Sequence, residues 1–340
     1  MNIPKITSIA ACCVVLSAPA FARDQIQVVG SSTVYPFITA AAEQFGQNGI
    51  FRTPIVESTG TGGGFKLFCE GNGEDKPDIS NASRKIVESE KQSCEKNGVT
   101  DVAEIPIGYD GIVIAEKKNT VLLNLTKQQI FLALARKLPD RHGKLLDNPN
   151  QTWKDVDAAL PDAPIEVYGP PPTSGTRDTF IELVMEQGCR QVPAFVKAIP
   201  DEAALKNACR LLREDGKYIE SGENYNVIVE KLINNEHALG IMGYGYYEEN
   251  TSKIQASKID GVMPTQMSIE SGQYGISRGL FVYIKKQHIG LIPGIAEFVQ
   301  EITSENAIGP DGYMTAKGLL PLKDEERKAV HVSAKNLQKL

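Results

Sequence analysis

Residues 25–37 read QIQVVGSSTVYPF: an alternating apolar run, a small hydroxyl-rich loop, and the first aromatic and apolar residues of a helical pattern. We expect a strand at 25–29, a loop at 30–34 and then a helix whose apolar residues recur four apart on one face. The start of a helix exposes backbone N–H groups without partners and carries about half a positive charge from the helix dipole. The loop therefore predicts a place where an anion can bind.

A second loop has the same character. Residues 60–64 read GTGGG and follow a predicted strand at 54–56, and we expect them to open a helix at 64–70. Backbone groups that only glycine leaves uncovered are typical of loops that hold an oxyanion.

Two more polar junctions follow predicted strands. Residues 173–177 read TSGTR after a strand at 165–168, and residues 81–84 read NASR after the run PDIS. Strands that alternate with helices in this way indicate an α/β fold with parallel strands. Because such sheets bind ligands at the carboxyl ends of their strands, we expect all of these loops to face one site.

The loops do not match the commoner phosphate or catalytic motifs. Gly60 and Gly62 fit a dinucleotide fingerprint, but its sixth position is Phe65, and a nucleotide P-loop would need lysine directly after Gly64. The positions two before and two after Ser174 are not glycine, so the nucleophile elbow of esterases is also missing. We therefore expect no catalytic residue, no cofactor and no metal site.

Chain length and net charge exclude some classes of protein. The chain has 340 residues, of which 41% are hydrophobic and 23% charged, and its formal net charge is -6. Single hydrophobic cores stop growing at roughly 250–300 residues, so two lobes are expected. A net negative chain without a basic face is not expected to bind nucleic acid. An anion can still bind to it, because helix starts act locally.

The first 22 residues have the features of a secretory signal peptide. Lys5 precedes the apolar run Ile9–Leu16, and Ala20–Ala22 supplies a small-x-small cleavage site. The run is far shorter than the roughly 20 apolar residues that span a bilayer. A second interpretation is that Ile9–Cys12 is a lipid-attachment site of the bacterial lipoprotein kind.

Cleavage after residue 22 would leave four cysteines: Cys69, Cys94, Cys189 and Cys209. An even number in an exported chain predicts disulfides, and four cysteines allow three pairings. Pairing between neighbours, Cys69 with Cys94 and Cys189 with Cys209, would stabilise the fold by roughly 3 kcal/mol per bond. Four buried free thiols are the alternative.

Taken together, the four polar segments resemble a known family. GSSTVYP at 30–36, GTGGGF at 60–65, NASR at 81–84 and TSGTR at 173–177 are similar to the loops of the periplasmic phosphate-binding proteins of bacterial phosphate ABC transporters, the PstS type. The resemblance implies an α/β, two-lobed type II periplasmic-binding-protein fold. Each lobe would be a mostly parallel sheet flanked by helices, with two crossover strands and the ligand in the interlobe cleft.

The resemblance also implies a role. It describes a periplasmic monomer, not an enzyme, that captures inorganic phosphate and delivers it to an inner-membrane ABC permease. The chain would divide into a signal peptide, a discontinuous first lobe and a second lobe: 1–22, then 23–109 with 276–340, and 110–275. Glycines in a long predicted strand at 105–115 and in the stretch 275–279 would be the hinges of the two crossings.

Carried over residue by residue, the resemblance assigns phosphate contacts to hydroxyl, backbone N–H and guanidinium groups of all four segments: Ser32, Thr33, Val34, Thr61, Gly62, Ser83, Arg84, Ser174, Gly175, Thr176 and Arg177. Well-known members place an aspartate at the junction where this chain has Arg84. They also carry an arginine ahead of Ser-Gly-Thr, where this chain has prolines. We therefore predict Arg84 and Arg177 as the cations.

The missing aspartate leaves the proton acceptor for hydrogen phosphate open between Asp78, Asp178 and a backbone carbonyl. It also motivates an alternative ligand, since the protein could bind another tetrahedral oxyanion, namely sulfate, molybdate or tungstate. A separate alternative is a periplasmic phosphatase or esterase, which would need a histidine or a metal beside Ser174.

Overall fold

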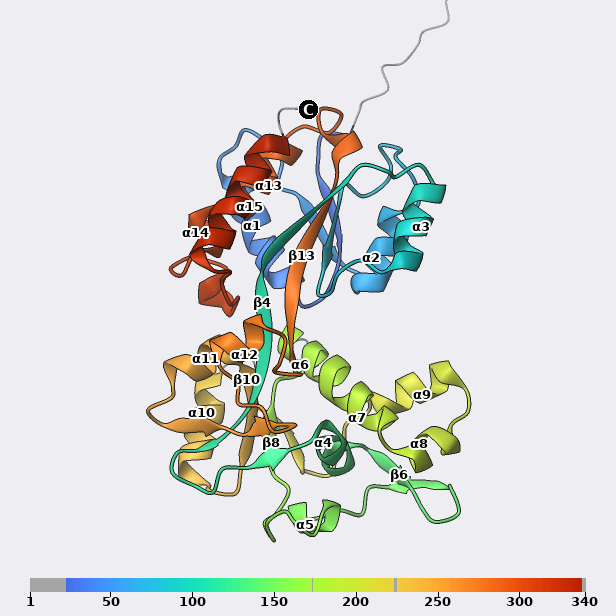
Figure 1. Ribbon diagram of the computed structural model, residues 1–340, viewed down its shortest axis with the longest axis vertical. Helices are drawn as coiled ribbons and strands as arrows, with labels where there is room; N and C mark the ends of the chain where they lie inside the picture. The colour runs from blue at the N-terminus through green and yellow to red at the C-terminus, as the bar shows by residue number, and fades with distance from the viewer. Residues whose placement is uncertain (1–22, 173, 223–224, 338–340) are drawn as a thin grey trace, which may run out of the picture.

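The computed structural model describes residues 23–172, 174–222 and 225–337. The predicted signal peptide, the alternative lipid site at Cys12 and Thr173 of the third loop lie outside the described residues. Figure 1 shows an α/β protein whose elements form an upper and a lower group, joined by the two long strands β4 and β13.

Among the described residues, nine strands form one sheet in the order β2-β1-β3-β13-β4-β10-β8-β9, with β11 pairing with β4 on the edge opposite β10. Their bounds are β1 (Gln27–Gly30), β2 (Ile55–Ser58), β3 (Ile79–Ala82), β4 (Val102–Lys117), β8 (Val167–Gly169), β9 (Tyr218–Glu220), β10 (Leu239–Gly243), β11 (Ile254–Ala256) and β13 (Ser277–Lys285). Two small pairs lie outside this sheet: β5 (Asn124–Leu125) with β12 (Lys258–Ile259), and β6 (Lys137–Pro139) with β7 (Leu145–Asp147).

The sheet is mixed, and the expectation of mostly parallel sheets is wrong. The sets β2-β1-β3 and β10-β8-β9 are parallel, but β13 runs antiparallel to both β3 and β4, and β4 runs antiparallel to β10. The reason is the crossing itself. One strand leads from the upper group to the lower one and the other returns, so the two must pair in opposite directions.

Helices cover both faces of the upper strands, with α1, α13 and α15 on one face and α2 and α3 on the other (Figure 1). The upper helices are α1 (Tyr35–Gln47), α2 (Thr61–Phe68), α3 (Glu88–Lys96), α13 (Ile295–Ile302), α14 (Glu305–Ile308) and α15 (Asp324–Asn336). The lower ones are α4 (Lys127–Leu134), α5 (Trp153–Val156), α6 (Gly175–Phe180), the π-helix η1 (Ile181–Met185), α7 (Glu186–Arg190), α8 (Pro193–Ala198), α9 (Glu202–Cys209), α10 (Tyr225–Asn234), α11 (Tyr244–Glu249) and α12 (Gln266–Glu270). Two 3-10 turns are η2 (Lys286–His288) and η3 (Thr315–Lys317). No helix within the described ranges has the length and apolar character needed to cross a membrane.

The buried apolar side chains gather in separate clusters. The largest joins the second half of β4 to the lower helices, for example Val113 with Phe131 and Val184. A second joins the upper strands to α1, α13 and α15, for example Val28 with Phe298. A third joins α2 and α3 to β3 and β13, for example Phe65 with Tyr283. β4 contributes to both of the first two clusters. Its buried apolar residues up to Ile107 belong to the upper cluster, and those from Ile112 onwards belong to the lower one.

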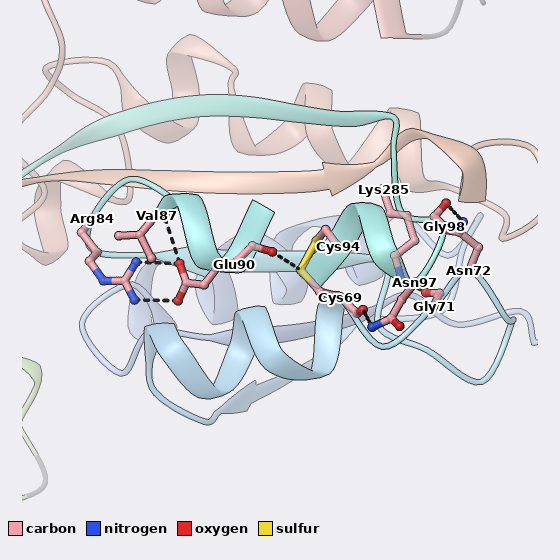
Figure 2. Close-up of a disulfide and its surroundings, with 10 residues drawn as sticks. All are labelled: Cys69, Gly71, Asn72, Arg84, Val87, Glu90, Cys94, Asn97, Gly98 and Lys285. Carbon is pink, nitrogen blue, oxygen red and sulfur yellow. Dashed lines mark hydrogen bonds and ion pairs between the residues drawn. A yellow bond between two sulfur atoms is a disulfide. The ribbon is translucent and has the colours of Figure 1, made fainter. Parts of the chain in front are cut away.

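Two disulfides select one of the three pairings that the sequence allows. Cys69 pairs with Cys94 and Cys189 with Cys209, so each bond joins cysteines that are neighbours in the sequence. Figure 2 shows the first bond, which holds the C-terminal end of α2 against α3. The predicted disulfides are therefore confirmed, and the interpretation as free thiols is wrong.

Glycine at the first crossing has an observable reason. Gly108 has φ +154°, and a Cβ added there would lie 2.6 Å from the carbonyl oxygen of Leu320. The backbone of the C-terminal segment thus approaches β4 too closely for any side chain. This close approach already requires glycine, and the role of Gly108 as a hinge stays a prediction.

Candidate anion-binding site

The carboxyl ends of three parallel strands meet at one edge of the sheet. Gly30 at the end of β1 is in register with Ser58 of β2 and Asn81 of β3. A Cβ on Gly30 would lie 2.0 Å from the carbonyl oxygen of Asn81, and a Cβ on Gly64 of α2 would lie 2.5 Å from the Cα of Gly30. Glycines therefore let the first loop, α2 and the end of β3 pack directly against one another.

The first loop presents backbone donors. Within the described residues, the N–H groups of Ser32, Thr33 and Val34 have no hydrogen-bond acceptor. Val34 is fully buried in the upper core, so it offers only its backbone, while Thr33 is buried and Ser32 is half-buried. The loop ends where α1 begins at Tyr35, as the sequence predicts.

The second loop differs from the prediction in where its helix starts. α2 begins at Thr61 rather than at Gly64, so the glycines form its first turn. The reason is that this turn must pack on Gly30, where side chains would not fit. The Thr61 hydroxyl accepts a hydrogen bond from the Ser83 backbone N–H at 3.2 Å and lies 3.1 Å from the Ser83 hydroxyl. Thr61 and Ser83 are thus brought together, with Gly62 exposed beside them.

The third loop contacts the first. Ser174 occupies the N-cap position of α6, and a Cβ added to Gly175 would lie 3.5 Å from both the Ser32 carbonyl oxygen and the Thr33 Cα. The Thr176 hydroxyl accepts a hydrogen bond of 2.7 Å from the Tyr225 hydroxyl. Two helix starts that lie far apart in the sequence therefore meet at Gly175.

The two predicted cations both have protein partners. Arg84 donates two hydrogen bonds, of 2.9 and 2.8 Å, to the Glu90 carboxylate (Figure 2). Burial acts to raise the pKa of Glu90, but hydrogen bonds from Arg84 and from the backbone outweigh it and hold that pKa below its usual value. Arg177 donates to the Pro170 carbonyl at 3.0 Å and to the Tyr218 hydroxyl at 2.9 Å, and lies 4.6 Å from the Tyr218 ring centroid. Anion contacts by these two arginines stay a prediction.

A third arginine reaches the first loop, and our sequence reasoning missed it. Arg278 of β13 donates a 2.6 Å hydrogen bond to the Thr33 hydroxyl and another of 2.6 Å to the Thr179 hydroxyl. Thr179 in turn donates to the buried carboxylate of Asp110 on β4 at 2.9 Å. Burial raises the pKa of Asp110, and the neighbouring charge of Arg278 opposes that rise. A sequence signal existed, because Arg278 and Asp110 are charged residues that directly precede glycines in the two predicted crossings.

Of the acceptors considered for the phosphate proton, Asp78 lies at the wrong end of the sheet. It precedes β3, whereas Ser83 follows it, and its carboxylate is taken up by Arg23, His288 and the Gln27 N–H. Asp78 is therefore a structural residue. Asp178 lies in the first turn of α6 and is half-buried.

Comparisons with known proteins identify the same family that the four loops resemble. A family model described as the PBP superfamily domain matches residues 17–306. Protein SphX of Synechocystis sp. is 32% identical over 318 residues, which cover 90% of this chain and 81% of that protein. The phosphate-binding protein PstS of Staphylococcus saprophyticus is 30% identical over 282 residues, which cover 81% of this chain and 75% of that protein.

A solved structure is also similar. The crystal structure of a possible phosphate binding protein from Planctomyces limnophilus DSM 3776 has a TM-score of 0.72 at 30% identity, covering 92% of this chain and 98% of that one. The resemblance found in the four loops is thereby confirmed: the chain belongs to the PBP superfamily.

Proposed function

We propose that this chain is the phosphate-binding component of an ABC transporter, which captures inorganic phosphate outside the cytoplasm and delivers it to an inner-membrane permease. The observation that carries the proposal is the contact between the first loop and the start of α6. The backbone N–H groups of residues 32–34 and 175–177 have no acceptor among the described residues. Relatives named phosphate-binding proteins support the choice of ligand.

The chemistry suits a multiply charged oxyanion. A buried anion is stable only if most of its oxygen lone pairs accept hydrogen bonds. Helix starts donate several N–H groups at once and carry no ionisable charge. The eleven residues assigned by resemblance, which include Thr61 and Ser83 with their paired hydroxyls, would complete the shell.

We further propose that the upper and lower groups of elements are two lobes of a type II periplasmic-binding fold that close on the ligand. The first lobe comprises 23–109 and 276–340, and the second 110–275. This division is supported by the separate cores and by the way β4 pairs with β13 up to Gly111 and with β10 from Ile112 onwards. Closure would be favoured because the ligand binds the closed form more tightly than the open form.

The site of action in this proposal is the periplasm, reached after removal of residues 1–22, and the working form is a monomer. Two disulfides support it, because such bonds persist in oxidising compartments. Mass spectrometry of the mature protein tests the processing. A chain that begins at Arg23 is expected, and an acylated chain that begins at Cys12 would contradict it.

Titration calorimetry with phosphate, sulfate, molybdate and tungstate tests the ligand. We expect phosphate to bind and, at about 100 times its Kd, to stabilise the fold by about 2.7 kcal/mol, visible as a higher melting temperature. Equal binding of sulfate would remove the claim of selectivity. Binding of molybdate or tungstate without phosphate would move the protein to another oxyanion, and turnover of a chromogenic phosphate ester would favour a phosphatase.

A further inference from the structure

Arg278 occupies a junction between the elements that carry the predicted anion loops. It lies on β13 directly opposite Asp110 of β4, and its side chain is only 8% exposed. One of its terminal nitrogens, Nη2, donates to the hydroxyls of both Thr33 and Thr179. Thr33 belongs to the first loop, and Thr179 to the helix that the third loop opens.

These hydrogen bonds make both threonine oxygens acceptors and limit where their hydrogens can go. A guanidinium has only donors, so both threonine oxygens must accept from Arg278, and each keeps a single hydrogen to donate elsewhere. Thr179 can give its hydrogen to the Asp110 carboxylate at 2.9 Å or to the Gly175 carbonyl at 3.0 Å. Thr33 has the Thr179 oxygen at 3.2 Å as its protein acceptor, and an anion in the first loop would be a stronger one.

The guanidinium is itself held in place. Its Nη1 donates to Glu182 at 2.6 Å, and its Nε lies 3.8 Å from the Asp110 carboxylate. Because an arginine fork presents its donors in a rigid plane, fixing two of its nitrogens fixes the third. The two threonines are therefore held by a clamp that is anchored in both crossing strands and in η1.

We infer that Arg278 is a positioning residue of the anion site, which holds the first loop against α6 and turns the Thr33 O–H toward an oxygen of the ligand. This inference rests on the proposed function, because the ligand is taken to be phosphate. The guanidinium that orients the first loop therefore comes from the strand β13 and not from one of the loops.

The test compares phosphate affinity in matched variants by titration calorimetry, with the melting temperature of each ligand-free variant recorded beside it. Arg278→Gln is expected to weaken phosphate binding by roughly 10- to 100-fold, the range typical of charge-assisted hydrogen bonds. Arg327→Gln is the control. It removes a similarly buried guanidinium that pairs with Glu305 in α14, remote from the loops, and should leave affinity unchanged.

A second pair separates positioning from mere packing. Thr179→Val keeps the shape but removes the hydroxyl, and should weaken binding about tenfold, while Thr179→Ser should restore most of the affinity. In the Arg278→Gln background, Thr179→Val should add little, because both changes break the same contact. If Arg278→Gln does not fold, the Thr179 pair decides alone.

The outcomes distinguish the inference from the function on which it rests. Absence of phosphate binding by the unaltered protein would contradict the proposed function. Normal binding by that protein, with Arg278→Gln within about twofold of it, would overturn the inference alone. Equal losses in Thr179→Val and Thr179→Ser would overturn it as well, because the hydroxyl would then not matter.

Discussion

The two ends of β3 differ in how their polar groups are paired. At its amino end, the fully buried Asp78 carboxylate accepts from Arg23 at 2.7 Å, from the Gln27 N–H at 2.8 Å and lies 2.6 Å from His288 Nδ1. At its carboxyl end, Ser83 contacts the Thr61 hydroxyl at the start of α2, where the first N–H groups lack acceptors within the described residues. The protein supplies its own counter-charges at one end and leaves backbone donors without acceptors, where we propose the ligand binds, at the other. Stability and binding should therefore separate along one strand.

The largest expected effect is at the amino end. Asp78→Ala leaves a buried guanidinium and imidazole without their shared carboxylate, and should lower the free energy of unfolding by about 3–5 kcal/mol. Denaturant unfolding measures it. The exposed pair of Asp24 and Arg52 gives the matched control, since Asp24→Ala should cost below about 1 kcal/mol. A small loss in Asp78→Ala would remove the contrast between the two ends.

The next effect concerns α2, which spans the distance between the ends. Replacing Cys69 and Cys94 together by serine should cost about 3 kcal/mol of stability, because the cross-link no longer restricts the unfolded chain. Phosphate affinity should persist, since the bond holds the end of α2 that lies away from Thr61. The double serine variant of Cys189 and Cys209 is the comparison. Affinity that falls with the first pair would show that the disulfide shapes the site.

At the carboxyl end we expect a substitution to change phosphate affinity more than stability. Thr61→Val removes the hydroxyl that pairs with Ser83, and should weaken phosphate binding about tenfold with little change in melting temperature. Calorimetry measures the affinity. Thr120→Val, which loses a hydroxyl bonded to the Lys117 carbonyl, should leave affinity unchanged. A melting temperature that drops while affinity holds would place Thr61 among the structural residues.

The smallest effect is a pH dependence at the amino end. Burial lowers the pKa of Lys285 to about 8, against 10.5 for the ordinary side chain, with Asp78 opposing the shift. Between those values the unfolded chain binds more protons than the folded one, so this group makes stability rise with pH. The stability of the unaltered protein minus that of Lys285→Met should grow by roughly 0.5 kcal/mol per pH unit from pH 8 to 10, less than one full proton allows. Exposed Lys66→Met should give a flat difference.

Some elements could be predicted because their signals are local. The start of α1 follows from the first hydroxyl loop, and the long strand expected at 105–115 lies within β4. The start of α2 could not be found the same way, because a run of glycines has low helix propensity. There the close approach of Gly64 to Gly30 decides, and this contact exists only after β1 and α2 pack.

The sequence indicated which loops expose N–H groups, but it did not indicate which arginine contacts them. The loops that expose N–H groups were named in advance, whereas Arg84 and Arg177, the arginines nearest to them in the sequence, are paired with Glu90 and Tyr218. The arginine that reaches Thr33 is Arg278, 245 positions away along the chain. Proximity in sequence does not predict which charged groups pair, because a long side chain pairs with groups that the packed strands place next to it.

The amino-acid sequence by itself determined the backbone chemistry of this protein: which loops carry glycines and hydroxyls, where a helix can begin, and which cysteines are available to pair. Only the tertiary structure decided which loops touch, which carboxylates are closed off, and which guanidinium meets the first loop. The physical reason is the distance along the chain over which each interaction acts. Helix capping and backbone exposure depend on a few neighbouring residues, whereas burial and ion pairing depend on β4 and β13 crossing between the two cores.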